Sequence, residues 1–327
     1  MSKRWRMAVS NTSKRTALVT GAAGFIGSHL VDALLQQGLQ VVGLDNLTTG
    51  DKTNLTTALE HEAFQLIVGD IREADVVRQV CENAEFVFHL AAVTKAAESV
   101  RNPQKYQDIN VEGTRTVLTE AAKENVKRIL FTSSAAVYGT PETVPTPEDV
   151  TLNPLSPYGV SKIEGEKMCQ TVSAEHGICI PQLRFFNIYG PRQSSETEAG
   201  IISIFLERSQ QGLPLIIYDD GHQTRDFIYI EDVIQAYLQA ATLEDVPSVP
   251  INVGTGIPVS ILELADEIRR QVPSCSSEIQ FEAPRTGDIY HSYANIELMQ
   301  QILQFTPQIP LSEGITKTFQ FSLQRSE

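Results

Sequence analysis

The strongest constraint on the fold is an alternation of short apolar runs with amphipathic stretches that begins at Thr16. The first run, 17–20, leads into a glycine-rich turn, and a stretch with apolar residues at helical spacing follows at 25–37 and closes before Gly38, a residue typical of helix C-termini. Further strands are predicted at 40–44, 64–68, 86–90, 128–132 and 180–186, and helices near 72–82, 104–124 and 156–175. Continuous apolar strands separated by helices predict a doubly wound α/β fold with a parallel sheet, because helices cover both faces of such a sheet.

The regular alternation stops after Asn187, where Pro, Gly and polar residues gather between 190 and 221. A chain of 327 residues has room for one large α/β domain and a smaller appendage. We expect the large domain to span 16–187, with 225–246 returning to it, and a smaller C-terminal lobe to comprise 188–224 and 247–327. Residues 1–15 are predicted to form a flexible basic tail.

The chain is acidic apart from its first fifteen residues. The formal net charge of −14 includes +5 from Lys3, Arg4, Arg6, Lys14 and Arg15, which leaves −19 for the rest. A body with this charge repels phosphate backbones and anionic lipid heads, so no nucleic-acid or membrane partner is expected. No apolar run approaches ~18 residues, and the basic N-terminus lacks the apolar segment of a secretory signal, so neither a membrane span nor secretion is expected.

Cysteine and histidine placement gives no sign of a metal site. The four cysteines contain no Cys-x-x-Cys pair, and the six histidines are scattered without ligand spacing. Reduced, buried thiols are typical of cytosolic proteins. We therefore expect a cytoplasmic protein with no disulfide and no metal, and we interpret His89, at the end of a predicted strand, as a structural residue.

The segment Gly21-Ala22-Ala23-Gly24-Phe25-Ile26-Gly27 connects the first predicted strand to the first helix. Glycines in such a turn let the backbone approach a pyrophosphate, whose charge is met by the helix N-terminus. Asp45 ends the second strand, where a carboxylate accepts hydrogen bonds from the adenosine ribose hydroxyls and repels a 2′-phosphate. The combination predicts a dinucleotide site that favours NAD over NADP. For Asp70, after the third strand, contact with the adenine edge and an N-cap role both remain open.

A candidate catalytic group consists of Ser134, Tyr158 and Lys162. Tyr158 and Lys162 lie four positions apart in a predicted helix and therefore share one face. A nearby ammonium stabilises the phenolate, so we expect it to lower the pKa of Tyr158 and suit this residue to general acid/base work. Ser134 follows a predicted strand, and the carboxyl ends of parallel strands form the ligand side of the sheet. Its hydroxyl can hydrogen-bond the oxygen whose proton Tyr158 moves.

These motifs, with Asp45-Asn46, His89-Leu90-Ala91-Ala92 and Arg184-Phe185-Phe186-Asn187-Ile188-Tyr189-Gly190-Pro191-Arg192, resemble the extended short-chain dehydrogenase/reductases, specifically the nucleotide-sugar epimerase/dehydratase group. The resemblance implies a Rossmann-type fold whose smaller C-terminal lobe binds the substrate. It implies that Ser134, Tyr158 and Lys162 are catalytic and that Asn187 binds the substrate diphosphate. The implied NAD-contacting residues are Gly21, Gly24, Phe25, Ile26, Gly27, Asp45, Asn46, Asp70, Ile71, Leu90, Ala91, Tyr158 and Lys162.

Two later segments, Gln223-Thr224-Arg225-Asp226-Phe227 and Pro284-Arg285-Thr286-Gly287-Asp288, are similar to arginine-bearing substrate motifs of that group. Two guanidinium groups suit a diphosphate, because each donates a forked pair of hydrogen bonds. We therefore expect Arg225, Arg285 and Asp288 to bind substrate, with an internal salt bridge as the alternative for the arginines. Lys95 is expected near the sugar pocket, where it either recognises a carboxylate or hydroxyl or points to solvent.

Ala135 and Ala136 occupy positions where the group's dehydratases carry an Asp-Glu pair and its decarboxylases a Glu. Methyl groups supply no acid or base for the loss of water. The resemblance therefore implies NAD-dependent 4-epimerisation of a nucleotide sugar, a UDP-hexose or its uronic-acid or N-acetyl relative, through a 4-keto intermediate. Decarboxylation, dehydration or reduction on the same scaffold is the alternative, and a non-catalytic NAD-sensing protein is a further one. The resemblance also implies a homodimer through the helices near 104–124 and 156–175.

Overall fold

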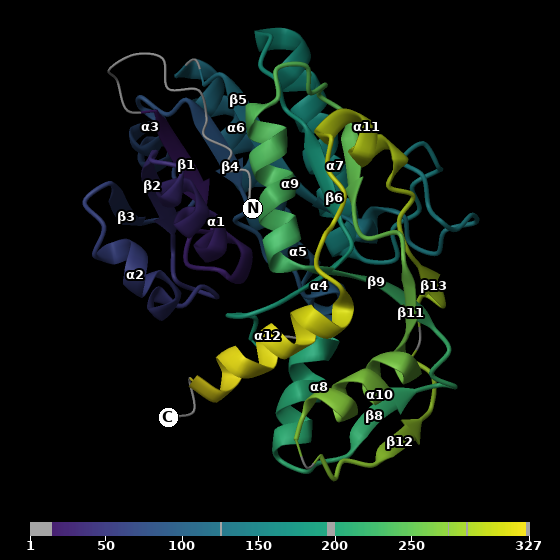
Figure 1. Ribbon diagram of the computed structural model, residues 1–327. Helices are drawn as coiled ribbons and strands as arrows, with labels where there is room; N and C mark the ends of the chain where they lie inside the picture. The colour runs from purple at the N-terminus through teal and green to yellow at the C-terminus, as the bar shows by residue number, and fades with distance from the viewer. Residues whose placement is uncertain (1–14, 125, 195–199, 274, 286, 325–327) are drawn as a thin grey trace.

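The computed structural model describes residues 15–124, 126–194, 200–273, 275–285 and 287–324. Its main feature is a seven-stranded parallel sheet in the order β3-β2-β1-β4-β5-β6-β10 (Figure 1). The strands are β1 (Thr16–Thr20), β2 (Gln40–Asp45), β3 (Phe64–Val68), β4 (Phe86–His89), β5 (Arg128–Ser134), β6 (Gln182–Phe185) and β10 (Pro250–Val253). The strand order reverses beside β1, as in the doubly wound Rossmann fold, which confirms the predicted fold class.

Helices cover both faces of the large sheet. One face carries α1 (Phe25–Gln36) and α9 (Ile230–Thr242), and the other carries α3 (Ala74–Cys81), α6 (Gly113–Lys123) and α7 (Pro157–His176) (Figure 1). Successive side chains of β1 enter opposite cores, as strand geometry requires. Ala17 and Val19 pack with residues of α1 and α9, whereas Leu18 packs with residues of α3 and α6. Short helices complete this part: η1 (Lys52–Leu55), α2 (Thr56–Leu59), α4 (Ala96–Arg101), α5 (Pro103–Tyr106) and η3 (Ala135–Val137).

The helix predicted near 104–124 contains a break in its regular geometry. Between α5 and α6 the chain forms a π-helical turn, η2 (Gln107–Glu112). Asn110 in this turn is buried, and its side chain bonds the backbone of Val93 through Val93 N–H (2.8 Å) and the Val93 carbonyl (2.9 Å). A π turn inside a helix is frequently associated with a functional site. Here it brings an amide side chain to the segment that follows β4.

The smaller lobe contains two further sheets. One consists of β7 (Asn187–Tyr189), β9 (Thr224–Tyr229), β11 (Pro258–Ser260) and β13 (His291–Ser292), and the other pairs β8 (Leu215–Tyr218) with β12 (Ile279–Glu282). The accompanying helices are α8 (Ile201–Gln210), α10 (Ile261–Gln271) and α12 (Leu311–Gln324), whereas α11 (Glu297–Leu303) packs against β10 and α9 of the large domain (Figure 1). A capping box between Ser260 and Glu263 begins α10 and satisfies the free N–H groups there.

The prediction that 225–246 returns to the large domain is wrong for the strand in this segment. The strand of this segment, β9, pairs with β7, β11 and β13 in the small sheet, and it is α9 that packs on the large one. The seventh strand of the large sheet is β10, inside the range 247–327 expected for the small lobe. Ile251, Asn252 and Val253 are completely buried there, because β10 follows the crossover helix α9 and pairs with β6.

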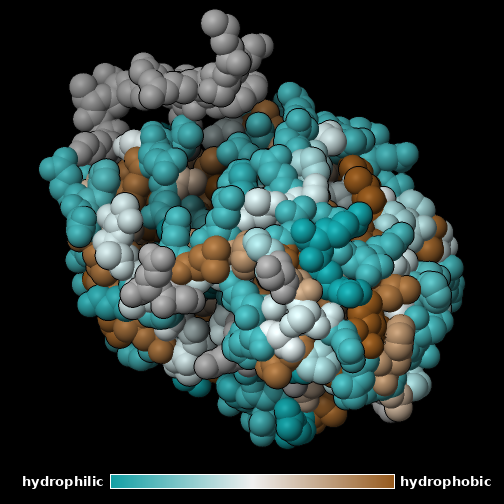
Figure 2. Space-filling view, turned by 60° about the horizontal axis from the view of Figure 1, so that its bottom comes forward, coloured by the Kyte–Doolittle hydropathy of each residue, from teal (hydrophilic) through white to brown (hydrophobic). Residues whose placement is uncertain are grey.

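The face at the bottom of Figure 1, brought forward in Figure 2, is mostly hydrophilic, with apolar side chains in several separate groups. Among the residues that the structure describes, no helix is long and apolar enough to cross a membrane. Within the same residues, no group of three or more His, Cys, Asp or Glu side chains could hold a metal ion.

Candidate active site

The glycine-rich turn joins β1 to α1 at the carboxyl edge of the large sheet. Gly21 has a φ of +72°, and a Cβ on it would lie 2.9 Å from the backbone nitrogen of Ala91. A Cβ on Gly27 would lie 2.0 Å from the Gly21 carbonyl oxygen, so α1 packs directly on the turn. Gly24 is the N-cap of α1, and the first turn of this helix contains no acidic residue. The turn therefore offers a helix N-terminus to an anion, which fits the pyrophosphate of a dinucleotide.

Asp45 lies next to this turn, at the end of β2. Its two carboxylate oxygens accept hydrogen bonds from Ala23 N–H (2.9 Å) and Leu47 N–H (2.8 Å). Burial raises the pKa of Asp45, and the two backbone donors oppose this effect. Because a carboxylate can accept about four hydrogen bonds, the two backbone bonds orient Asp45 and leave capacity for ribose hydroxyls.

Asp70 and Asn46 lie at the ends of the neighbouring strands β3 and β2. Asn46 Nδ2 donates to Asp70 Oδ2 (3.1 Å), and Arg72 binds the same carboxylate through its side chain and its N–H. The hydrogen bonds from Arg72 lower the pKa of Asp70 to about 2. The N-cap of α3 is Glu73, so the N-cap alternative for Asp70 is wrong. Ile71, the next residue, is buried against Gly113 of α6.

A chain of hydrogen bonds supports the segment after β4. Thr20 Oγ1 accepts the N–H groups of Leu90 and Ala91, both at 3.2 Å, and lies 2.8 Å from His89 Nδ1. His89 Nε2 lies 2.9 Å from Thr114 Oγ1. Burial, assisted by the charge of Lys162, lowers the pKa of His89 to about 3. His89 is therefore a neutral residue that links two hydroxyls, which confirms its structural interpretation.

The three predicted catalytic residues come together at the same edge of the sheet. Ser156 caps α7 by accepting Gly159 N–H (3.2 Å), and Pro157 begins the helix, so Tyr158 lies in its first turn and Lys162 follows one turn later. Ser134, at the end of β5, hydrogen-bonds the Tyr158 side chain. The Lys162 ammonium donates to the Thr132 carbonyl (2.8 Å) and lies 5.9 Å from the centroid of the Tyr158 ring.

The expected lowering of the Tyr158 pKa by Lys162 is wrong for this structure. Burial raises the pKa of Tyr158, and only the hydrogen bond with Ser134 acts in the opposite direction. Burial also lowers the pKa of Lys162 to about 8, with the charge of Glu166 among the opposing effects. Desolvation is the largest effect on both groups, and the ammonium of Lys162 is bound to the Thr132 carbonyl.

Asn110 is a site residue that the sequence analysis missed. In addition to its bonds with Val93, its Nδ2 atom donates to Ser161 Oγ (3.0 Å), and Ser161 Oγ donates to the Tyr158 carbonyl (2.7 Å). Asn110 thus connects the segment after β4 with the first turn of α7. A polar residue at a buried position of the stretch 104–124 is the signal that could have identified it.

The predicted substrate residues lie in the smaller lobe and at its border. Arg225 on β9 donates to Asp288 Oδ1 (2.6 Å) and to the Thr224 carbonyl (2.9 Å), so the salt-bridge alternative holds for this arginine in the structure. Arg285 is exposed, and its guanidinium carbon lies 3.7 Å from the centroid of the Tyr218 ring. Thr286 of the same motif lies outside the described residues.

Asn187 and Lys95 border the catalytic group from two directions. Asn187 is the half-buried first residue of β7 and is paired with Phe227 of β9. Lys95 precedes α4, and its carbonyl accepts the Tyr106 hydroxyl (2.6 Å). The Tyr106 ring packs edge-on against Tyr158, with centroids 6.4 Å apart. The backbone of Lys95 is therefore linked to Tyr158 through Tyr106, while the role of the Lys95 side chain stays a prediction.

Ala135 and Ala136 form the short turn η3 immediately after Ser134. Ala136 N–H donates to Ser134 Oγ (3.2 Å). Both residues carry only a methyl group next to Ser134 in the chain, and a methyl group can neither donate nor accept a proton.

Comparison with known proteins agrees with this arrangement. Residues 17–254 match the model of the NAD dependent epimerase/dehydratase family. The UDP-glucose 4-epimerase of Mycolicibacterium smegmatis is 38% identical over 312 residues, which cover 95% of this chain and 99% of that protein. UDP-glucuronic acid decarboxylase 1 of Danio rerio is 33% identical over 318 residues, covering 96% of this chain and 74% of that protein.

Among solved structures, the UDP-glucose 4-epimerase of Thermotoga maritima with UDP-glucose superposes with a TM-score of 0.90. It is 33% identical in sequence, and the match covers 95% of this chain and 100% of that one. The chain therefore belongs to the NAD-dependent epimerase/dehydratase family.

Proposed function

We propose that this protein catalyses the NAD-dependent 4-epimerisation of a UDP-sugar, either a hexose or its uronic-acid or N-acetyl relative. The observation that carries the proposal is the convergence of Ser134, Tyr158 and Lys162 beside the glycine-rich turn. An acid/base tyrosine next to a dinucleotide site suits the removal of a hydride and a proton from one secondary alcohol.

The cofactor site is proposed from the turn and the strand ends around it. Backbone groups of Gly21, Gly24–Gly27, Leu90 and Ala91 would contact NAD, with the helix N-terminus of α1 at the pyrophosphate. Asp45 would accept the adenosine ribose hydroxyls, which favours NAD over NADP. The bound nicotinamide supplies a reversible hydride acceptor for the C4 hydrogen of the sugar.

In the proposed reaction, Tyr158 accepts the proton of the C4 hydroxyl as the hydride leaves C4, and Ser134 holds the reacting oxygen by a hydrogen bond. This step requires Tyr158 as the phenolate, which burial disfavours and the hydrogen bond with Ser134 favours. Lys162 is proposed to leave the Thr132 carbonyl and to add its positive charge beside the phenolate. The resulting 4-keto sugar presents its other face, and Tyr158 returns the proton to the oxygen when the hydride returns to C4. The sugar thus changes configuration at C4 without net oxidation.

The substrate diphosphate is proposed to bind Asn187, Arg225 and Arg285. A diphosphate has more acceptor oxygens than one guanidinium can satisfy, so two arginines on separate segments are suitable donors. Arg225 is held by Asp288, and this pair either turns toward the diphosphate together or opens when the diphosphate binds. Lys95 is proposed to recognise a polar substituent of the sugar, because its backbone contacts the tyrosine that packs on Tyr158.

Epimerisation is favoured over the alternative chemistry of this scaffold by the turn η3. Decarboxylation remains the second candidate, since a UDP-glucuronic acid decarboxylase is among the relatives. Ala135 and Ala136 argue against elimination, because neither can act as an acid or base beside C5 or C6. Mass spectrometry of the products from UDP-glucose and UDP-glucuronic acid separates the candidates: epimerisation leaves the mass unchanged, whereas loss of water or carbon dioxide would contradict the proposal.

A homodimer is also proposed, through the helices of the stretches 104–124 and 156–175. Val160 on the exposed side of α7 is 42% accessible, and Val100 on the adjacent α4 is 62% accessible. Burial of such apolar side chains stabilises a helix interface. Light scattering coupled to size-exclusion chromatography tests this proposal, and a monomeric mass at micromolar concentration would contradict it.

A further inference from the structure

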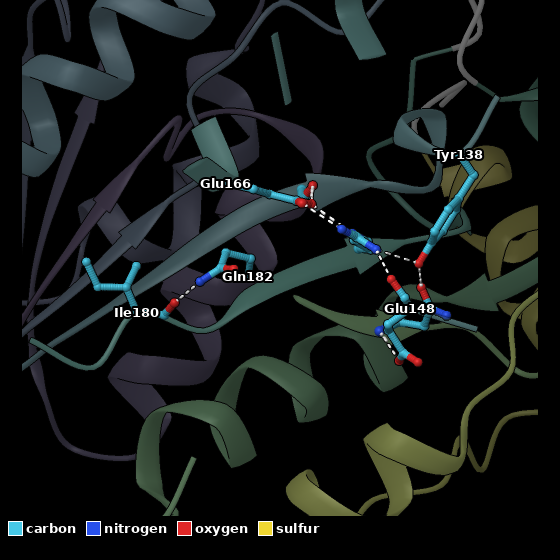
Figure 3. Close-up of polar contacts among 8 residues, drawn as sticks. Tyr138, Glu148, Glu166, Ile180 and Gln182 are labelled. Atoms are coloured by element: carbon cyan, nitrogen blue, oxygen red, sulfur yellow. Dashed lines mark hydrogen bonds and ion pairs between the residues drawn. The ribbon is translucent and has the colours of Figure 1, made fainter. Parts of the chain in front are cut away.

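A buried polar network connects β5, β6 and α7, the elements that carry or adjoin the candidate catalytic residues (Figure 3). Its centre is the ion pair between Arg184 on β6 and Glu166 on α7. Arg184 Nε lies 2.9 Å from Glu166 Oε1, and Arg184 Nη2 lies 2.7 Å from Glu166 Oε2. Both side chains are almost completely buried, with 3% and 4% exposed. A forked, buried pair of this kind fixes the orientation of both groups, because loss of either partner leaves an uncompensated charge.

The residues on both sides of Ser134 bond this ion pair. Ser133 Oγ donates to Glu166 Oε1 (2.5 Å), and Ser133 lies directly opposite Arg184 in the pairing of β5 with β6. On the other side, Arg184 Nη1 donates to the Tyr138 hydroxyl (3.0 Å), and Tyr138 ends the turn η3 that follows Ser134. The position of Ser134 is therefore determined from both directions by the same pair of charges.

The ion pair also determines where α7 lies on β5. Glu166 follows Lys162 by one helical turn, on the helix that also carries Tyr158. Between them, a Cβ on Gly165 would lie 2.4 Å from the Phe131 ring, so glycine permits close contact of α7 with β5. The Lys162 ammonium lies 5.3 Å from the centroid of the same ring. A shift of α7 along β5 would therefore break the bond between Ser133 and Glu166 and separate Tyr158 from Ser134.

The network continues toward the smaller lobe. The Tyr138 hydroxyl donates to Asn252 Oδ1 on β10, and Asn252 Nδ2 donates to the carbonyls of Thr146 (2.8 Å) and Asn295 (3.2 Å). Figure 3 shows Glu166 at one end of the network and Tyr138 and Glu148 at the other. The same side chains thus link the catalytic strand β5 and helix α7 with segments that precede and follow the small-lobe sheets.

We propose that Glu166 and Arg184 are positioning residues for the catalytic group, holding Ser134 through Ser133 and Tyr138, and holding Tyr158 and Lys162 through α7. This inference rests on the proposed function, which assigns the three catalytic residues. A polar network that served only the stability of the core would not need partners on both sides of the catalytic serine.

Two conservative variants test the inference without breaking the ion pair. Ser133→Ala and Tyr138→Phe each remove one hydroxyl next to Ser134 and keep Glu166 bound to Arg184. Turnover should fall roughly tenfold or more in each variant, because small misplacements of reacting groups have large effects on rate. The KM of the sugar nucleotide should stay near the wild-type value. Glu166→Gln should lower turnover further, because it also weakens the contact between α7 and β6.

Matched controls separate positioning from general stability. Tyr189→Phe removes one hydroxyl from another buried tyrosine, whose partner is the Leu311 carbonyl (3.3 Å). Glu120→Gln changes a buried carboxylate on α6 that is paired with Arg78 and Lys123, outside the catalytic group. Both controls should keep wild-type turnover in the folded protein, even where the unfolding temperature falls.

A second measurement needs no substrate. Hydrogen exchange of residues 134–138, measured by mass spectrometry, reports the N–H groups of Ala136 and Tyr138, which bond Ser134 Oγ and the Ala135 carbonyl. Exchange there should be several-fold faster in Ser133→Ala and Tyr138→Phe and unchanged in Tyr189→Phe. An inactive wild-type protein would refute the proposed function, while exchange would still test the positioning. Wild-type exchange at 134–138 in both variants, or wild-type turnover despite faster exchange, would overturn the inference.

Discussion

Arg225 and Asp288, both assigned to substrate binding, bind each other: Nη2 of Arg225 lies 2.6 Å from Oδ1 of Asp288. The arginine is largely buried, and this burial lowers its pKa, whereas Asp288 acts to raise it. A guanidinium held in one orientation loses less side-chain entropy when a diphosphate binds. The pair is therefore compatible with the proposed substrate binding.

Arg225→Ala and Arg285→Ala should each weaken UDP binding by roughly 1.5–3 kcal/mol, the usual contribution of a hydrogen bond to a charged group. Isothermal titration with UDP measures this loss. Asp288→Asn is the control for Arg225, since it removes the partner charge and keeps the arginine. Normal UDP affinity in both alanine variants, together with a large loss of thermal stability, would show that the arginines are structural.

Tyr158→Phe should abolish turnover and leave NAD binding nearly unchanged, because only the hydroxyl that transfers the proton is lost. The phenyl ring retains its edge-on contact with Tyr106. Turnover with UDP-sugars and the amount of NAD bound to the purified variant are the two quantities to measure. Near-wild-type turnover would refute the assignment of Tyr158 as the acid/base group.

Asp45 should determine the choice of cofactor. Protein stripped of nucleotide should bind NAD more tightly than NADP, because a carboxylate beside the ribose repels a 2′-phosphate. Asp45→Asn should reduce the difference in affinity between NAD and NADP, because the amide still accepts hydrogen bonds but carries no charge. Isothermal titration of both proteins with both nucleotides is the measurement. Tighter binding of NADP by the wild type would contradict the proposed role.

His89 should make the protein less stable at acidic pH. The pKa of His89 is lowered to about 3, so below about pH 6.5 the unfolded chain binds a proton that the folded protein does not. Stability from this group is complete above pH 6.5 and decreases as the pH falls toward 3. Between pH 7 and pH 5 the wild type should lose about 2 kcal/mol more unfolding free energy than His89→Gln, measured with urea. Equal losses of unfolding free energy in the wild type and in His89→Gln would contradict this prediction.

Most of the large sheet could be predicted from the sequence. Phe86–His89 forms β4 within the expected range 86–90, because a continuous apolar run is typical of a strand covered on both faces, and all four residues are buried. The convergence of Ser134, Tyr158 and Lys162 could be predicted as well, since it depends on strand ends and helical spacing. Ser134, Tyr158 and Lys162 need only a local pattern to be found.

Other features depend on contacts between distant residues. The π turn at Asn110 exists because that side chain binds Val93, seventeen positions earlier, and helical spacing cannot show this. Either β9 or β10 could be the strand that returns to the large sheet, because both are short strands with parallel partners. Only the pairing of β10 with β6 and of β9 with β7 decides between them. The pair of Glu166 and Arg184 joins a helix to a strand, and the local sequence around neither residue indicates that the two form an ion pair.

The central claim is that the hydride removed from C4 returns to C4 on the opposite face. The direct test uses UDP-glucose, UDP-N-acetylglucosamine and UDP-glucuronic acid, each labelled with deuterium at C4, in unlabelled water without added cofactor. Proton NMR and mass spectrometry of the products should show the galacto-configured sugar, with unchanged mass and with deuterium still at C4. Loss of the label to solvent, or products that have lost water or carbon dioxide, would contradict the account.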